Sequence, residues 1–311
     1  MALGVALALV CALGWGAFDA WRKRLAVVMP VAPLVVVLSL GHVPLFAGWV
    51  GLTGGQITST AYWAPGLGSV LLNVVGNLTF LYAVRVSPLS RMIPLLSFVP
   101  VFAALLAVPM LGETLTPGQW LGVATVVVGA VLLGADVGRE PGPPGPPESL
   151  ELRGPAGWWM GLWGLVRALL RERGSIPMLV TAAVWAGTLV LDKRALVFAD
   201  SSVHGLVIMS GMSVGTLLWL VVRGELGQLR RLSGSWGTYG VALALGGTAM
   251  GVQLVAIPLV MLALLEAIKR AVGLFCAVVM GRLMFGEPVT GAKVVAVLVM
   301  GGGASLVLLA G

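Results

Sequence analysis

Long apolar runs, each about as long as a lipid bilayer is thick, constrain the fold of this chain more than any other feature of its sequence. A helix needs roughly 20 mostly apolar residues to cross the hydrocarbon core of a bilayer. Of the 311 residues, 59% are hydrophobic and 44 more are glycine. Charged residues make up 10%, against roughly 25% in soluble domains. The sequence therefore predicts an all-α polytopic membrane protein and excludes a soluble globule.

Polar breaks and Pro or Gly positions divide the apolar sequence into ten predicted transmembrane helices. A transmembrane barrel would show short strands of alternating hydrophobicity, and an open sheet cannot cross lipid because its edge groups would stay unpaired. The predicted spans cover residues 3–21, 31–51, 64–84, 89–111, 117–136, 177–199, 203–222, 238–259, 261–285 and 290–310.

Residues 137–175 have the composition of a soluble segment, since they hold nine of the 31 charged residues (19 Lys and Arg plus 12 Asp and Glu). The stretch Pro141–Pro147 predicts a stiff, extended linker. Residues 156–173 mix tryptophans with arginines, which favours a helix in the headgroup plane with its arginines toward anionic lipid. The alternative is an N-terminal extension of the sixth span.

The two halves of the chain repeat. Leu111–Thr116 aligns with Phe285–Thr290 at an offset of 174, and Trp15–Arg24 aligns with Trp185–Arg194 at an offset of 170. Each half holds five spans, an odd number, so the second half must insert upside down relative to the first. The predicted parts are a first five-helix repeat (1–136), the linker with its in-plane helix (137–175), and a second, inverted five-helix repeat (176–311).

The sequence from Phe102 to Leu133, which contains Leu-Gly-Glu-Thr-Leu-Thr-Pro-Gly-Gln-Trp-Leu-Gly, resembles the end of an EamA-type repeat. That repeat is the unit of the ten-helix drug/metabolite transporter superfamily. Lys269-Arg270 followed by Phe285–Thr290 looks like the second repeat, and the Lys-Arg pair is similar to the phosphate-binding ninth helix of the triose-phosphate and nucleotide-sugar branch. That branch also has a lysine in the fourth span, where this chain has Leu96.

The resemblance implies a membrane transporter, so we expect neither an enzyme nor a cofactor. Its relatives export amino acids, move drugs or exchange sugar phosphates. The sequence has no Walker loop, which argues against ATP-driven transport by this chain alone. Its two histidines, His42 and His204, have no carboxylate or cysteine at ligand spacing, so the sequence does not indicate a catalytic or metal site.

Charged residues inside the predicted spans are functional candidates, because a charge in lipid is costly unless it faces a cavity or a partner. Glu266, Lys269 and Arg270 lie at i, i+3 and i+4 in the ninth span, so they share one helix face and the acid can neutralise one base. One positive charge is then left to bind an anion. The alternative is that the ninth span begins later and leaves all three residues in a solvated loop.

Two more charged clusters lie at the ends of the first and sixth predicted spans. Asp19 is one turn beyond Trp15 and one turn before Lys23, so the three share a helix face. Lys193 and Arg194 end the sixth span. The alternative for both clusters is anchoring of helix ends by the positive-inside rule. Because the inverted repeat places the clusters on opposite membrane sides, that rule cannot account for both.

Polar and aromatic residues within the spans complete the predicted site. They are Asn73 and Asn77 at i and i+4 of the third span, Tyr82 further along it, Gln253 in the eighth span, and the repeat-related Trp15 and Trp185. The alternative for the amides is the pairing of helices across small residues.

These residues predict secondary transport of a small polar, anionic or zwitterionic metabolite, such as an amino acid or a phosphorylated compound, by alternating access. Lys269 and Arg270 would hold the anion, with help from the basic pair that ends the sixth span. Glu266 and Asp19 would keep the empty site near neutral and couple transport to protons. The alternatives are a flippase for lipid-linked intermediates, a drug exporter, and a channel-like or regulatory membrane protein.

Loop charges predict the orientation. Lys269 and Arg270 lie within a span, and 15 of the other 17 basic residues fall in loops on the side away from the termini. The positive-inside rule then places residues 137–175 in the cytoplasm and both termini outside, whereas many members of the superfamily are described with cytoplasmic termini. We expect a multi-pass protein of a cell membrane, such as a bacterial inner membrane, either monomeric or a homodimer, with no nucleic-acid partner.

Overall fold

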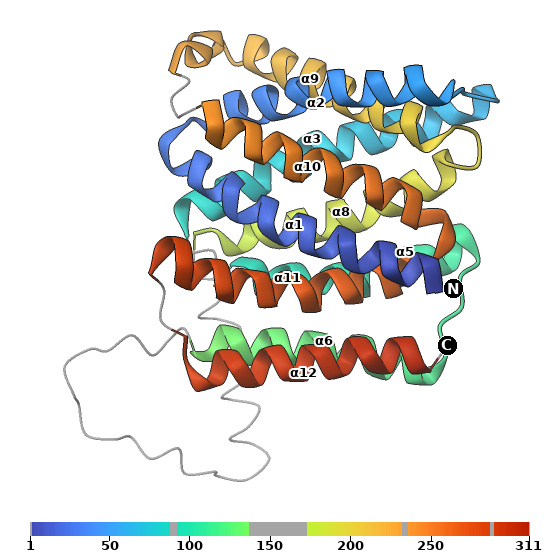
Figure 1. The fold of residues 1–311 in the computed structure, drawn as a ribbon, viewed down its shortest axis with the longest axis vertical. Helices are drawn as coiled ribbons and strands as arrows, with labels where there is room; N and C mark the ends of the chain where they lie inside the picture. The colour runs from blue at the N-terminus through green and yellow to red at the C-terminus, as the bar shows by residue number, and fades with distance from the viewer. Residues whose placement is uncertain (1, 88–91, 137–172, 232–235, 287–288, 311) are drawn as a thin grey trace.

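The computed structural model is a bundle of helices that lie side by side (Figure 1). It describes residues 2–87, 92–136, 173–231, 236–286 and 289–310. Within these ranges there is no strand, and one isolated bridge joins Ile57 to Ala199. The predicted all-α polytopic class is confirmed. Residues 137–172, which hold the predicted linker and nearly all of the predicted in-plane helix, lie outside the described residues.

The helices follow the order of the predicted spans. In the first half they are α1 (Ala2–Val28), α2 (Val31–Thr53), α3 (Trp63–Val86), α5 (Val99–Leu111) and α6 (Pro117–Asp136), with 3-10 segments η1 (Thr60–Tyr62) and η2 (Ile93–Phe98). In the second half they are α8 (Ser175–Ala195), α9 (Ser201–Val222), α10 (Trp236–Ala256), α11 (Leu262–Phe285) and α12 (Gly291–Leu309), with η3 (Leu226–Arg231) and η4 (Ile257–Leu259).

Six of the described helices are long and apolar enough to cross a membrane. They are Leu3–Val28, Val31–Thr53, Thr60–Val86, Ser175–Ala195, Ser201–Val222 and Trp236–Leu259. Leu95–Leu111 and Val294–Val307 are shorter apolar helices, and charges interrupt the apolar sequence of α11. The count of ten spans therefore stays a prediction.

The structure corrects the end of one predicted span and the regularity of another. The first span was placed at 3–21, but α1 continues to Val28 because Arg22 and Lys23 are buried in the bundle instead of marking the membrane surface. The span at 89–111 is not one continuous α-helix, since the 3-10 segment η2 precedes α5. Pro94 and Pro100 have no backbone N–H to donate, which disfavours a regular helix through this stretch.

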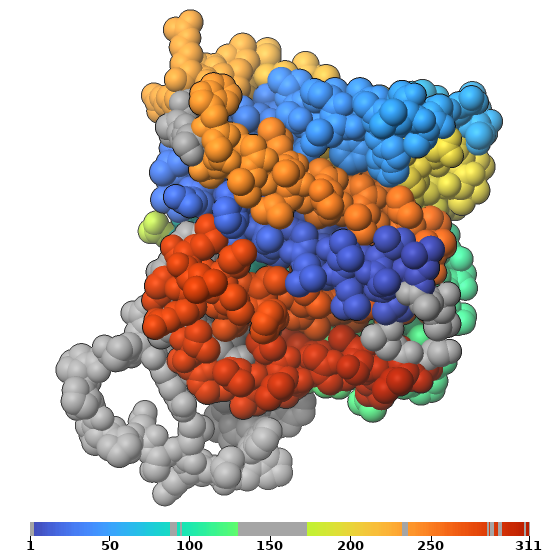
Figure 2. Space-filling model, in the orientation of Figure 1, coloured from blue at the N-terminus to red at the C-terminus, as the bar shows by residue number. Residues whose placement is uncertain are grey.

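The helices pack in matched pairs. α1 packs against α10 and α11, while α8 packs against α3 and α5. α2 lies against α9 at one end of the bundle and α6 against α12 at the other (Figure 1). If α1 corresponds to α8, α10 to α3 and α11 to α5, each contact of one half has a counterpart in the other. The predicted repeat would require this correspondence, and the repeat itself stays a prediction. In the space-filling view α10, α1 and α11 form a continuous surface (Figure 2).

The Gly-Glu sequence of each half marks the end of a helix. Gly112 and Gly286 follow α5 and α11 in the left-handed conformation, with φ of 68° and 67°, which a glycine adopts without steric cost. Before α6, the Thr116 hydroxyl accepts from the Gln119 N–H and the Gln119 side chain accepts from the Thr116 N–H. This is the capping box that the sequence predicts.

Candidate functional site

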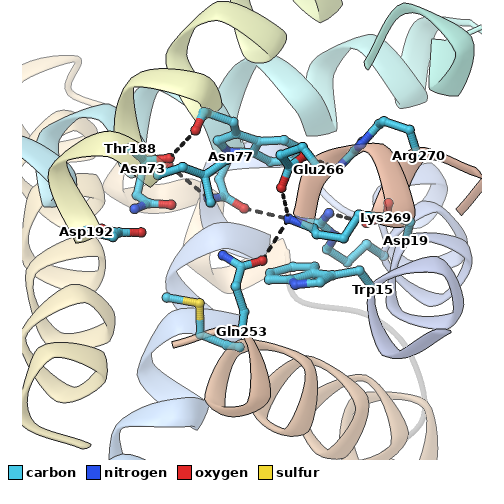
Figure 3. A pocket seen from close by; sticks show the side chains of 14 residues that line it. Trp15, Asp19, Asn73, Asn77, Thr188, Asp192, Gln253, Glu266, Lys269 and Arg270 are labelled. Carbon is cyan, nitrogen blue, oxygen red and sulfur yellow. Dashed lines mark hydrogen bonds and ion pairs between the residues drawn. The ribbon is translucent and has the colours of Figure 1, made fainter. Parts of the chain in front are cut away.

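A cavity lies among α1, α3, α8, α10 and α11 (Figure 3). We call it the central cavity. Its empty volume, together with the open space at its mouth, is about 550 Å³. Its lining residues are Trp15, Asp19, Arg22, Asn73, Asn77, Trp185, Thr188, Leu189, Asp192, Met250, Gln253, Glu266, Lys269 and Arg270.

The α11 wall of the central cavity carries the charged face that the spacing predicts. Glu266 is fully buried and accepts a hydrogen bond from Lys269 Nζ, and its second oxygen lies 3.1 Å from Arg270 Nη2. Lys269 Nζ also donates to Gln253 Oε1 at 2.7 Å. All three charged residues lie within α11. They therefore do not form the solvated loop cluster that the sequence left as an alternative.

The α1 wall is built around Arg22. Its guanidinium donates to Asp19 Oδ1 and, at 3.1 Å, to Asn77 Oδ1. It also lies over the rings of Phe80 and Phe18, at 4.2 and 4.6 Å from the ring centroids. These contacts offset part of the cost of burying the guanidinium almost completely, and the rings add cation–π attraction, while the buried Nε has no hydrogen-bond partner among the described residues. Arg22 is thus fixed in the cavity wall.

Sequence reasoning missed Arg22 as a site residue because it was grouped with the basic residues at the end of the first predicted span. A signal was available, since Trp15, Asp19 and Arg22 lie at i, i+4 and i+7 and so share one face of a helix. The rings of Trp15 and Trp185 lie 5.6 and 5.7 Å from the Arg22 guanidinium, which places both predicted tryptophans at this wall.

The α8 wall carries Asp192, which sequence reasoning also missed. Its carboxylate accepts from the Ser69 hydroxyl and pairs with His204 Nε2 at 3.1 Å. His204 Nδ1 lies 3.0 Å from the Tyr62 hydroxyl. Asp192 and His204 are 12 residues apart on successive helices, a distance at which no sequence spacing signals a pair. The repeat offset of 170, which aligns position 192 with Arg22, was the available signal.

Several predicted site residues lie elsewhere. Lys193 and Arg194 border a separate pocket at the end of α8. There Lys193 Nζ donates to Glu113 Oε1 at 2.6 Å and to the Val260 carbonyl at 2.9 Å. Lys23 is buried but does not line the central cavity. Tyr82 is exposed and borders another pocket, near Arg85, Glu225 and Arg231. The structure thus brings nine of the 13 predicted residues together in the central cavity.

The charges of the central cavity balance but are unevenly placed. The lining holds three acids and three bases, namely Asp19, Asp192, Glu266, Arg22, Lys269 and Arg270. On the α11 wall two bases share one acid, which leaves one positive charge there. On the α8 side the ion-pair partner of Asp192 is a histidine. Figure 3 shows these two groups on opposite sides of the cavity.

A second, mostly apolar pocket adjoins the central cavity. It shares Trp15, Arg22, Asn73, Asn77 and Met250 with it and has an empty volume of about 490 Å³. Its other walls include Phe18, Leu38, Met209 and Met212. An apolar part of a bound molecule could therefore extend away from the charged walls.

Comparisons with known proteins bear on the first half of the chain and on the fold. Residues 2–135 match the model of the EamA-like transporter family. Protein LicB of Haemophilus influenzae is 32% identical over 79 residues, which are 25% of this chain and 27% of that protein. The chain thus matches about a quarter of the length of this curated relative. A solved crystal structure covers 96% of both chains with a TM-score of 0.64 and 16% identity, which shows a shared fold.

Proposed function

We propose that the chain is a membrane transporter, as the match of residues 2–135 to the EamA-like transporter family indicates, and that it carries a small anionic or zwitterionic metabolite by alternating access. The central cavity would hold the substrate while the helices around it open to one membrane side at a time. Ionisable side chains at membrane depth, such as those that line this cavity, are typical of substrate paths.

The unneutralised positive charge on the α11 wall carries the proposal. Lys269 and Arg270 are adjacent in the sequence, and both form ion pairs with the fully buried Glu266. A buried charge without a full partner costs several kcal/mol, and an anionic group of the substrate would offset that cost. The guanidinium and the ammonium together can donate several hydrogen bonds to a carboxylate or a phosphate.

The size of the charge surplus favours the amino-acid class over the phosphorylated class. A phosphate monoester carries about −1.5 to −2 charges near pH 7, more than the single positive charge left on the α11 wall. A carboxylate carries one negative charge and matches that surplus. The leucine at position 96, which is buried and apolar, provides no further cation for a phosphate.

The apolar pocket next to the central cavity favours a second candidate, export of larger amphipathic molecules such as drugs. Met209, Met212 and Met250 line it, and methionine side chains adapt to ligands of different shape. This candidate predicts that bulky apolar cations or anions compete with amino acids for transport.

We also propose that transport is coupled to protons. The same proposal places the chain in a bacterial inner membrane, with both termini outside. Glu266 and Asp19 were the predicted proton carriers. Each already has a permanently charged or basic partner, Lys269 and Arg270 for Glu266 and Arg22 for Asp19. Since each acid is already held in an ion pair, we propose charge balance as the role of these two residues.

Uptake of a panel of radiolabelled amino acids into proteoliposomes tests the proposal. Lys269→Gln and Arg270→Gln should abolish the flux of the amino acid that the wild type carries, while Arg194→Gln, which removes a base outside the central cavity, should retain it. Detergent stability of each variant separates loss of binding from misfolding. Absence of wild-type flux for every amino acid, or normal flux through both α11 variants, would contradict the proposal.

A further inference from the structure

We propose that Asp192 and His204, positioned by Tyr62, form a proton-binding site in the wall of the central cavity. This inference rests on the proposed transport function, because the site would couple substrate movement to protons. It lies on the α8 side of the cavity, apart from the Lys269–Arg270 pair on α11 (Figure 3).

The site is a buried chain of hydrogen bonds that starts at the cavity. Asp192 is 2% exposed and lines the cavity, while His204 and Tyr62 are 0% exposed. His204 Nε2 lies 3.1 Å from Asp192 Oδ1, and His204 Nδ1 lies 3.0 Å from the Tyr62 oxygen. The Ser69 hydroxyl donates to the same Asp192 oxygen. The chain thus joins α8 to α9 and to the segments at the start of α3.

The surroundings of Asp192 differ from those of the other two cavity acids. Asp19 and Glu266 pair with Arg or Lys side chains, whose charge is present at any physiological pH. The ion-pair partner of Asp192 is His204, whose charge depends on a proton. Because histidine changes its charge between about pH 5 and pH 8, this pair can gain or lose a proton during transport.

The other elements packed around Asp192 bring no unpaired titratable group to it among the described residues. α3 presents Ser69 and Asn73, which do not titrate. Across the cavity lie the ion pairs of α1 and α11. On α8 itself, Lys193 is bonded to Glu113 and Arg194 borders the separate pocket. The described residues of α5 and η2, which also pack on α8, include no titratable side chain.

The proton step balances without any further reactant. Before it, His204 Nε2–H donates to the Asp192 carboxylate and the Tyr62 O–H donates to Nδ1. A hydronium ion in the cavity then gives one proton to the pair and leaves as water. If the proton stays on the carboxyl group, the ring is neutral. If it stays on the ring, Nδ1–H donates to the Tyr62 oxygen after the hydroxyl has turned.

In both forms the pair gains one proton and the cavity gains one positive charge. That charge favours an anionic group at Lys269 and Arg270, so proton and substrate bind cooperatively. Coupling between two ligands is reciprocal and typically amounts to about 5- to 150-fold in affinity. The expected transport mode is therefore movement of proton and substrate together.

Proton uptake by the purified protein in lipid vesicles, without any substrate, tests the site independently of the transported molecule. Between pH 9 and pH 5 the wild type should bind about one proton more than the double variant Asp192→Asn/His204→Gln, whichever of the two groups holds that proton. Tyr62→Phe should shift the pH at which the proton binds. His42→Gln is the matched control, since His42 is a buried histidine bonded to the Leu243 carbonyl.

Equal proton uptake by the wild type and this double variant would overturn the proton site, even if amino-acid flux is normal. Flux supplies the second readout. The ratio of uptake with and without an acid-outside gradient should exceed one in the wild type and fall to one in His204→Gln, a ratio that lower expression alone does not change. An unchanged ratio in His204→Gln would also overturn the site. Titration without flux would instead contradict the proposed function.

Discussion

The first helix of each half, α1 and α8, presents the same framework to the central cavity with opposite charge. Trp15 and Trp185 correspond at an offset of 170 and both line the cavity. Seven residues after each tryptophan comes an ionisable residue that also lines it, Arg22 on α1 and Asp192 on α8. The predicted repeat would account for the matching positions of these side chains, whose charges are opposite.

The partners of the two residues differ as well. Arg22 is surrounded by Asp19, Asn77 and aromatic rings and stays charged at any physiological pH. Asp192 is bonded to a serine and a histidine, so its pairing can change with protonation. In the proposed proton site, α8 thus supplies a charge that depends on a proton, whereas α1 supplies a fixed charge.

The largest effect is expected when the fixed charge is removed. Arg22→Met leaves the partly buried Asp19 without its cation, and loss of one partner of a buried ion pair costs about 3–5 kcal/mol. Unfolding in detergent should show this loss. Arg24→Met is the control because Arg24 is exposed on the same helix, and its effect should stay within about 0.5 kcal/mol. Equal stability of both variants would mean that α1 does not depend on Arg22.

A smaller effect on stability is expected at Lys193, the residue after Asp192. Lys193 directly follows Asp192 but is bonded to Glu113 and the Val260 carbonyl outside the central cavity. Because hydrogen bonds to charged groups contribute about 1.5–3 kcal/mol, Lys193→Gln and Glu113→Gln should each lower stability by about that much. The double variant should lose little more than either single one. Additive losses, or loss of transport on the scale of Lys269→Gln, would contradict this separation.

The smallest effect concerns the two tryptophans. Trp15 lies near both Arg22 and Lys269, whereas Trp185 lies near Arg22. Cation–π contacts contribute about 0.5–1 kcal/mol at exposed sites and about 2 when desolvated, so Trp15→Phe should weaken substrate binding more than Trp185→Phe. Binding titrations of both variants measure the difference. A stronger effect of Trp185→Phe would reverse the comparison and make α8 the main aromatic contact.

The sequence predicted features that depend on local spacing. The charged face of α11 followed from Glu266, Lys269 and Arg270 at i, i+3 and i+4, and the apolar runs gave the helices. The pairing of Asp192 with His204 depends on how α8 and α9 pack, and no spacing encodes that. Arg22 was misjudged for the same reason, because its aromatic and acidic partners come partly from α3 and burial of a charge is a tertiary property.

The central claim is that the anionic group of the substrate binds at Lys269 and Arg270. A double cycle of binding measurements tests it. The Kd is measured for two ligands, the transported amino acid and the amine left when its carboxylate is removed, and each ligand is titrated into the wild type and into Arg270→Gln. Loss of a charge-assisted hydrogen bond costs about 1.5–3 kcal/mol, or roughly 10- to 150-fold in Kd. If carboxylate and guanidinium bind each other, removal of both should weaken binding no more than removal of either. If the fold-losses in affinity from the two changes multiply, the carboxylate binds elsewhere and the account is contradicted.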